Sequence, residues 1–169
     1  MRNSYKKELH MYRILIASVV AIVAVTPVFG KDLRADKNKA IVRRIFTDIL
    51  SQGRFEVAPE IYAKDFVNHE TTRDLGFDES QAVDHGWRAA FPDLELTIER
   101  EIAEGDFVTV VWRGRGTNTG NGNGLNATGK MAEGRGISIF RVEDGRIKEE
   151  WTESSQLVIL RQLGLFPGR

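Results

Sequence analysis

The chain contains no cysteine among its 169 residues. This absence excludes disulfide bonds, thiolate nucleophiles, cysteine-based metal sites and a lipidated cysteine. The chain also lacks an excess of either charge, because it has 24 basic (Lys+Arg) and 24 acidic (Asp+Glu) residues. It therefore has no overall basic field to attract nucleic acid, and we expect no nucleic-acid partner. The composition, 41% hydrophobic and 28% charged, is typical of a folded globular protein.

The longest hydrophobic run is short: it spans residues 14–25 and includes one polar residue, Ser18. A membrane-spanning helix needs roughly 20 apolar residues. Four basic residues precede the run, and "PVFG" follows it at 27–30. This pattern predicts a secretory signal peptide over residues 1–30, with an uncleaved membrane anchor as the alternative. We therefore expect an exported protein, periplasmic or secreted, that has no contact with the membrane after cleavage.

The rest of the chain has no internal repeat or linker, so residues 31–37 are expected to form a short tail and residues 38–166 one domain. Apolar residues at helical spacing predict a helix over residues 36–51, followed by Gly53 as a stop signal. A second, short helix is predicted over residues 55–62. A third is predicted over residues 79–91, where Pro92 ends it.

After Pro92 the hydrophobic pattern alternates, which predicts strands over residues 94–102, 107–117, 136–142 and 147–155. In the first of these strands, Leu94, Leu96, Ile98 and Ile102 are expected on one face. "EDGR" at 143–146 is a hairpin signal, and "TGNGNGLNATG" at 119–129 is expected to be a long hairpin connection. Residues 157–163 are predicted to form a last helix. The fold class is therefore α+β, with three N-terminal helices covering one face of an antiparallel sheet.

Several short motifs occur in an order that resembles a known family. They are "FVNHE" (66–70), "AFPDLELTIE" (90–99), "EGDFVTVVWRGRGTNTG" (104–120), "ATGK" (127–130), "FRVEDGRIKEEW" (140–151) and "LRQLG" (160–164). The order is similar to that of the SnoaL-like polyketide cyclase (ester cyclase) family. That family belongs to the nuclear-transport-factor-2-like superfamily, together with ketosteroid isomerase and limonene epoxide hydrolase. The resemblance implies a cone-shaped curved sheet that encloses an apolar pocket.

The resemblance also implies a chemistry. Ring-forming members catalyse an aldol-type closure, which needs a base to remove a proton beside a carbonyl and a donor for the enolate oxygen. We expect neither a cofactor nor a metal, because the three histidines show no paired ligand spacing. The family's acid/base is an aspartate four residues after the strand tryptophan. Counted from Trp151, that position is Ser155, so the mechanism does not transfer unchanged.

Two other residues are candidates for the missing proton carrier. Glu153 is expected to share a face with Trp151 and Ser155, and a buried carboxylate there would have a raised pKa; the alternative is a solvated glutamate at the strand end. His69 matches a histidine at the family's pocket rim and could be a base or a donor; the alternative is a structural hydrogen bond. The candidate catalytic residues are therefore His69, Glu153 and Ser155.

Polar and aromatic residues are expected to bind a small hydrophobic, carbonyl-bearing molecule. Asn118 replaces a histidine that is frequent in the family and could donate a hydrogen bond without titrating. The expected substrate-binding residues are Asn68, Trp87, Phe91, Trp112, Asn118 and Trp151. Three functions remain open: a cyclase or isomerase, a non-catalytic ligand-binding pocket, and an accessory domain that dimerises through its exposed sheet face. We expect a homodimer.

Overall fold

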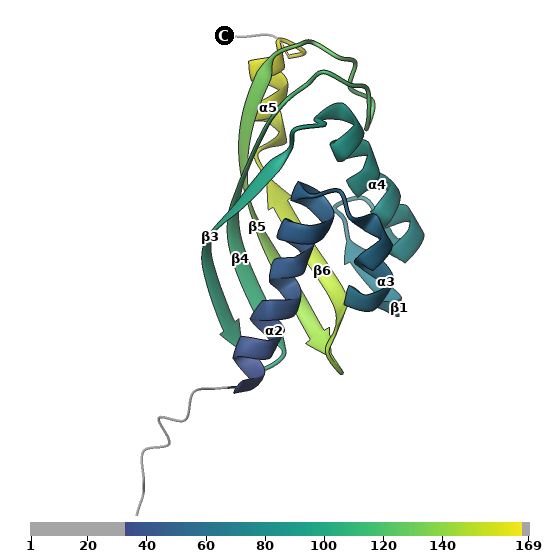
Figure 1. The fold of residues 1–169 in the computed structure, drawn as a ribbon, viewed down its shortest axis with the longest axis vertical. Helices are drawn as coiled ribbons and strands as arrows, with labels where there is room; N and C mark the ends of the chain where they lie inside the picture. The colour runs from purple at the N-terminus through teal and green to yellow at the C-terminus, as the bar shows by residue number, and fades with distance from the viewer. Residues whose placement is uncertain (1–32, 167–169) are drawn as a thin grey trace, which may run out of the picture. The chain divides into compact units, whose positions relative to one another are not determined.

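The structure is a computed structural model that describes residues 33–166, which form one compact unit. The predicted signal peptide lies outside the described residues. Helix α2 (Leu33–Arg44) continues into a π-helical segment, η1 (Ile45–Ser51) (Figure 1). The remaining elements follow in chain order: η2 (Phe55–Val57), α3 (Ala58–Ile61), β1 (Tyr62–His69), β2 (Asp74–Gly76), α4 (Phe77–Ala90), β3 (Glu95–Glu104), β4 (Phe107–Thr117), β5 (Met131–Glu143), β6 (Arg146–Ser154) and α5 (Gln156–Leu163).

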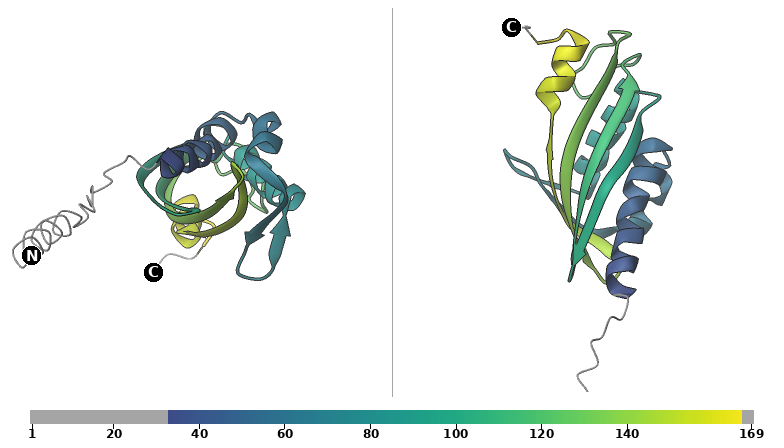
Figure 2. Two further views of the ribbon diagram at one scale, coloured as in Figure 1. Left: turned by 90° about the horizontal axis from the view of Figure 1, so that it is seen from below. Right: turned by 90° about the vertical axis from the view of Figure 1, so that its left-hand side faces the viewer.

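The six strands form one mixed sheet in the order β2-β1-β6-β5-β4-β3. Strands β3 to β6 pair antiparallel in succession, whereas β1 pairs parallel with β6. Seen end-on in Figure 2, the long strands curl around one face, which the helices cover. This is the curved α+β architecture of the nuclear-transport-factor-2-like fold, as predicted. Within residues 33–166, no helix has both the length and the apolar character needed to cross a membrane.

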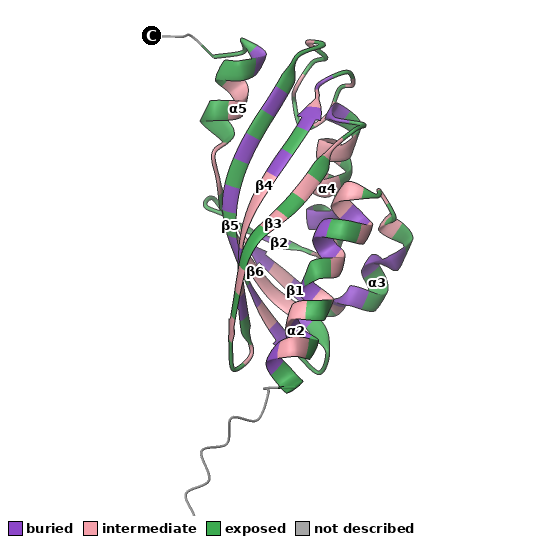
Figure 3. Ribbon diagram, turned by 60° about the vertical axis from the view of Figure 1, so that its left-hand side comes forward, coloured by how far each residue is buried: buried purple, intermediate pink, exposed green. Residues whose placement is uncertain are grey.

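The hydrophobic core lies between helix α2–η1 and the inner, concave face of the sheet. Val42, Ile45 and Ile49 from the helix pack against Val110 and Phe140, and all five are buried. Buried and exposed residues alternate along the whole length of β5, as is typical of a strand with one buried face (Figure 3). The helix begins at Leu33, three residues before its predicted start, and ends at Ser51 as predicted.

Strands β1 and β2 were not predicted. The sequence "YAKDFVNH" of β1 has no regular alternation, and its burial is irregular too. The strand forms because it pairs with β2 on one side and, on the other, with β6, which is far away in the sequence. Its existence is therefore decided by tertiary pairing and not by local preference.

A β-bulge in β3 reverses the face that its side chains occupy. Ile98 pairs with Trp112 but Arg100 pairs with Val111, so one extra residue lies between them. Because side chains alternate with a period of two, this residue turns the rest of the strand over. The prediction that Ile102 shares a face with Ile98 was wrong: Ile102 is on the outer face and 67% exposed.

A second irregularity has the same effect in β6. Ile147 pairs with Val142 and Glu149 pairs with Arg141, which leaves Lys148 without a partner in the ladder. Beyond it, the residues directed to the inner face are Glu150, Thr152 and Ser154, opposite Phe140, Ser138 and Gly136. Trp151 and Glu153 pair with outward-facing Ile139 and Ile137. The prediction that Trp151 and Glu153 face the interior was therefore wrong.

Candidate functional site

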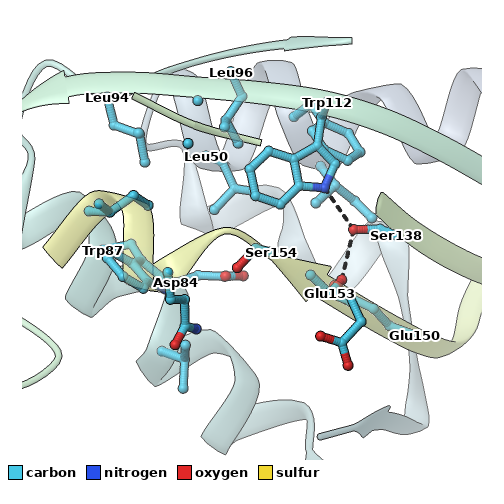
Figure 4. Close-up of a pocket in the computed structure, with 18 of the residues that line it drawn as sticks. Leu50, Asp84, Trp87, Leu94, Leu96, Trp112, Ser138, Glu150, Glu153 and Ser154 are labelled. Atoms are coloured by element: carbon cyan, nitrogen blue, oxygen red, sulfur yellow. Dashed lines mark hydrogen bonds between the residues drawn. The ribbon is translucent and has the colours of Figure 1, made fainter. Parts of the chain in front are cut away.

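A cavity of about 460 Å³ lies between the helices and the inner face of the sheet. Its volume is in the range of small-molecule sites. Figure 4 shows Leu94, Leu96 and Trp112 on one side of it, with Trp87 and Asp84 across from them. The apolar lining comes from η1, α4, the connection between α4 and β3, strands β3 to β5, and α5. It includes Ile45, Phe46, Leu50, Trp87, Phe91, Leu94, Leu96, Trp112, Phe140 and Ile159.

Hydrogen bonds on the inner face connect Trp112 to Glu150. The indole Nε1 of Trp112 donates to Ser138 Oγ at 3.0 Å, and Ser138 Oγ lies 2.7 Å from Thr152 Oγ1 (Figure 4). Thr152 Oγ1 in turn donates to Glu150 Oε1 at 3.0 Å. Because Thr152 has a single hydroxyl hydrogen and gives it to Glu150, Ser138 is the donor in its bond with Thr152.

The Trp112 ring requires a glycine beside it. A Cβ added at Gly136 would lie 2.3 Å from Cζ2 of Trp112. Gly136 therefore lets the indole lie against the sheet at the position that its hydrogen bond to Ser138 requires.

Glu150 lies on the inner face of the sheet, and the pKa of its carboxyl group is raised. Burial raises the pKa of its carboxyl group to about 7, against a smaller opposing effect of the hydrogen bond from Thr152. The negative charge of Glu70 raises this pKa further. A carboxyl group with a pKa near 7 is present in both protonation states at neutral pH, as a general acid or base requires.

Asp84, from helix α4, is the second carboxyl group of the cavity. Burial raises its pKa well above the ordinary value, and the charge of Glu150 raises it further. Its hydrogen-bond partner is Gln81, whose Nε2 donates at 3.5 Å. Among the described residues, no basic side chain lowers the pKa of either group. We call Asp84 and Glu150 the carboxyl pair, since both line the cavity and the charge of Glu150 disfavours ionisation of Asp84.

Two amide side chains close to the carboxyl pair have unused acceptors. Asn68 is 7% exposed, lines the cavity, and is the neighbour of Glu150 in the β1–β6 ladder. Its Nδ2 donates to Ser80 Oγ at 3.3 Å, whereas its Oδ1 is buried without a partner among the described residues. Oε1 of Gln81 is likewise buried and without a partner there. Buried polar atoms are ordinarily hydrogen-bonded, so these two oxygens are exceptions in the part of the chain that the structure describes.

Four of the residues expected to bind substrate line this cavity: Asn68, Trp87, Phe91 and Trp112. Their role in binding stays a prediction. Asn118 does not line it. It is fully buried, its Nδ2 donates to the carbonyl oxygens of Ala90 and Gly120, and its Oδ1 accepts from the amide of Thr128. The expectation that Asn118 donates into the pocket was wrong, because its amide holds the β4–β5 connection together.

The expected pairing of His69 with Glu153 in one cavity was wrong. His69 stacks on Trp151 with ring centroids 4.5 Å apart, and its Nδ1 lies 3.0 Å from Asp74 Oδ1. Neither ring is part of the cavity lining. Glu153 borders the cavity but is exposed, opposite Ile137. The bulge at Lys148 is the cause, since it exchanges the faces of β6.

Ser155 precedes helix α5 and makes structural hydrogen bonds. Its Oγ accepts from the amide of Arg135 at 2.8 Å, and its own amide donates to the Arg135 carbonyl at 2.9 Å. Of the three expected catalytic residues, the structure brings none to the carboxyl pair.

The family model described as SnoaL-like polyketide cyclase matches residues 40–163. The chain belongs to this family. No curated protein matches this SnoaL-like chain. Among solved structures it is similar to AclR, a candidate hydroxylase from Streptomyces galilaeus, with a TM-score of 0.72 and 22% identity over 79% of this chain and 89% of that one.

Two further structures show the same likeness. One is IdmH, a candidate polyketide cyclase from Streptomyces antibioticus, with a TM-score of 0.66 and 27% identity over 75% of this chain and 98% of that one. The other is a candidate SnoaL-like polyketide cyclase from Jannaschia, with a TM-score of 0.73 and 23% identity over 81% of this chain and 98% of that one. These likenesses support the fold of this SnoaL-like protein.

The sequence reasoning missed the carboxyl pair. Asp84 stands three residues before Trp87, which was predicted to face the sheet, and that spacing places two residues on one side of a helix. This signal could have identified Asp84. Glu150 had no comparable signal, because alternation counted from Ile147 directs it outward and only the bulge turns it inward.

Proposed function

We propose that this SnoaL-like chain, exported as residues 1–30 predict, catalyses proton transfer next to the carbonyl group of a small hydrophobic molecule in the cavity. The reaction is of the lyase or isomerase type, and family membership favours aldol-type ring closure. The observation that carries the proposal is the carboxyl pair, Asp84 and Glu150, coupled in one aromatic-lined cavity.

The two carboxyl groups suit the two roles that this reaction requires, a base and a hydrogen-bond donor. Ionised Glu150 is the base: it takes a proton from the carbon beside the carbonyl, and the electron pair of the C–H bond becomes the enolate π bond. Protonated Asp84 is the donor that stabilises the enolate oxygen. In a ring closure, the enolate carbon attacks a second carbonyl, and the new alkoxide takes a proton from the pair. Apolar walls around the pair exclude water from the reacting atoms.

Exchange of carbon-bound hydrogen tests this proposal without knowledge of the natural substrate. We expect the protein to accelerate deuterium incorporation into the position beside the carbonyl of 2-tetralone in D₂O, followed by NMR. Glu150→Gln should remove most of the acceleration. Glu149→Gln is the matched control, because Glu149 lies on the same strand but on the outer face and outside the cavity lining, and it should leave the rate unchanged. A wild-type rate equal to the buffer rate, or loss of rate in the Glu149 variant alone, contradicts the proposal.

The outer face of the sheet supports a second proposal, that the protein is a homodimer. Its exposed apolar side chains form what we call the outer apolar strip: Ile102, Phe107, Ile137 and Ile139. Ion pairs border the strip, such as Arg113 with Glu99 and Arg115 with Glu95. Because these charges are paired within the chain, they do not repel a second copy related by a twofold axis.

Light scattering tests the dimer directly. We expect a dimer mass for the wild-type protein and a monomer mass for Ile139→Lys, since a lysine in the strip would be desolvated without a partner. A monomeric wild-type protein at micromolar concentration contradicts the proposal.

A further inference from the structure

We propose that Trp112, Ser138 and Thr152 are positioning residues for Glu150, which they hold so that its Oε2 atom takes the proton from the substrate. We call the three residues the donor series. The inference rests on the proposed function, because it concerns the neighbours of the base named there, and it adds which oxygen reacts and which side chains fix it. Strand register, the direction of the hydrogen bonds and the surroundings of Glu150 support it.

The register of three strands brings the donor series together. Ser138 on β5 is directly opposite Thr152 on β6, and their hydroxyl oxygens lie 2.7 Å apart. Trp112 on β4 pairs with Gly136, two residues before Ser138, and its indole Nε1 donates to Ser138 Oγ at 3.0 Å (Figure 4). Thr152 and Glu150 are two residues apart on one face of β6, so Thr152 Oγ1 can donate to Glu150 Oε1, at 3.0 Å.

Each hydroxyl of the donor series has a single hydrogen, which fixes the direction of the bonds. Ser138 accepts from the indole of Trp112 and gives its own hydrogen to Thr152, which gives its hydrogen to Glu150. A proton on Oε1 of Glu150 would reverse the last two bonds. The Ser138 hydroxyl hydrogen would then have no acceptor among the described residues, in a side chain that is 2% exposed. Because a buried donor without a partner is unfavourable, Oε1 stays an acceptor.

The second carboxylate oxygen of Glu150 is left for the substrate. Within residues 33–166, Oε2 makes no hydrogen bond and is not one of the fully buried atoms without a partner, so it is in contact with the cavity that Glu150 lines. Since Oε1 is held as an acceptor, Oε2 is the atom that takes the proton. The bond from Thr152 fixes the direction in which Oε2 points, as a base that must meet one C–H bond requires.

Thr152 is the only described side chain that donates a hydrogen bond to Glu150. The other titratable groups coupled to Glu150 are Tyr62 on β1, Glu70 after β1 and Asp84 on α4, and none of them is a cation. Burial raises the pKa of Glu150, the hydrogen bond from Thr152 lowers it, and the charge of Glu70 raises it. Thr152 therefore favours the ionised form, which is the form that a base needs.

Replacement of the Thr152 hydroxyl group tests the inference. Thr152→Val removes the donor and keeps the shape of the side chain, whereas Thr152→Ser keeps the donor. In Thr152→Val we expect the pKa of Glu150, measured by carbon-13 NMR of its carboxyl carbon, to rise by about one unit, which is about tenfold tighter proton binding. The midpoint of the pH profile of 2-tetralone exchange should rise equally. Thr152→Ser should keep both at the wild-type values.

Two further variants complete the test. Thr97→Val is the matched control, because Thr97 is exposed, pairs with Arg113 and lies outside the cavity lining, and it should change neither value. Ser138→Ala tests the direction of the bonds. Without Ser138, Thr152 can accept a proton from Oε1, so the pKa of Glu150 should rise, but by less than in Thr152→Val.

The outcomes separate this inference from the proposed function. An unchanged pKa of Glu150 in Thr152→Val, an equal rise in Thr152→Ser, or no rise in Ser138→Ala overturns the inference. A cooperative thermal transition establishes that a variant is folded, and if Thr152→Val is not, Ser138→Ala decides. Wild-type exchange of 2-tetralone with an unchanged pKa in Thr152→Val refutes the inference alone. Because the NMR titration needs no substrate, the expected rise in a protein without exchange activity refutes the catalytic proposal alone.

Discussion

Two adjacent glutamates, Glu149 and Glu150, lie on opposite faces of the same sheet, and their pKa values show how the two faces differ. On the outer face, a hydrogen bond from Arg141 at 2.7 Å lowers the pKa of Glu149. On the inner face, burial raises the pKa of Glu150 to about 7. The outer carboxylates Glu95 and Glu99 are also bound by arginines. Charge on the outer face is thus neutralised within the chain, whereas on the inner face burial favours the neutral form of the carboxyl groups.

The largest expected effect is on activity. Glu150→Gln removes the base of the inner face, and general-base catalysis is typically worth 10²- to 10⁴-fold, so we expect deuterium exchange to slow by at least about 10²-fold. In the wild-type protein the rate should rise as pH rises through about 7, because the base must be ionised. Rate measurements from pH 5 to pH 9 check both expectations. A rate that falls over the interval from pH 6 to pH 7 would show that the base is a different group.

The second prediction concerns the free energy of unfolding. Ionisation of a glutamate lowers it on the inner face of the sheet and raises it on the outer face. The pKa of Glu150 is about 7 in the folded protein and near 4.5 in the unfolded chain. The folded state therefore binds more protons between these values, and stability falls as pH rises from about 4.5 to about 7. We expect Glu150→Gln to remove this loss and to stabilise the fold at pH 8 by about 2 to 3 kcal/mol, as measured by urea unfolding.

The third prediction compares steric tolerance on the two faces. Gly136→Ala places a methyl group against the ring of Trp112, and we expect the free energy of unfolding to fall by about 1 to 3 kcal/mol. Ile137→Ala, the next residue along but 50% exposed on the outer face, should change it by less than about 1 kcal/mol in the monomeric Ile139→Lys background. Equal effects at the two positions would contradict the assignment of faces.

The smallest effect is expected for Glu149→Gln. Because the folded pKa of Glu149 is lowered, its contribution to stability is present above the unfolded pKa and is lost as pH falls through the folded value. The group is partly exposed, so we expect a loss below about 1 kcal/mol at pH 8 and almost none at pH 3. Urea unfolding at the two pH values checks this. Stabilisation by this variant at pH 8 would show that Glu149 resembles Glu150 after all.

Most of the helices and strands could be predicted from the periodicity of hydrophobic residues in the sequence. Helical spacing located α2 and α4, and alternation located β3 to β6 with the turn "EDGR" between the last two. The site was predictable in its apolar part and at one polar residue, Asn68. Trp87 and Phe91 were expected to bind substrate, and both line the cavity. Of the three residues chosen for chemistry, Glu153 was assigned to the wrong face, and His69 and Ser155 lie outside the cavity lining.

The sequence by itself determined most of the helices and strands, β1 and β2 excepted, and that one face of the sheet is buried, because these properties depend on the spacing of apolar residues. Only the tertiary structure decided which side chains face the cavity. Lys148 stands outside the β5–β6 ladder, and a single unpaired residue reverses every side chain after it. Whether a residue is left unpaired depends on the strands on either side, and one of these, β1, is far from β6 in the sequence.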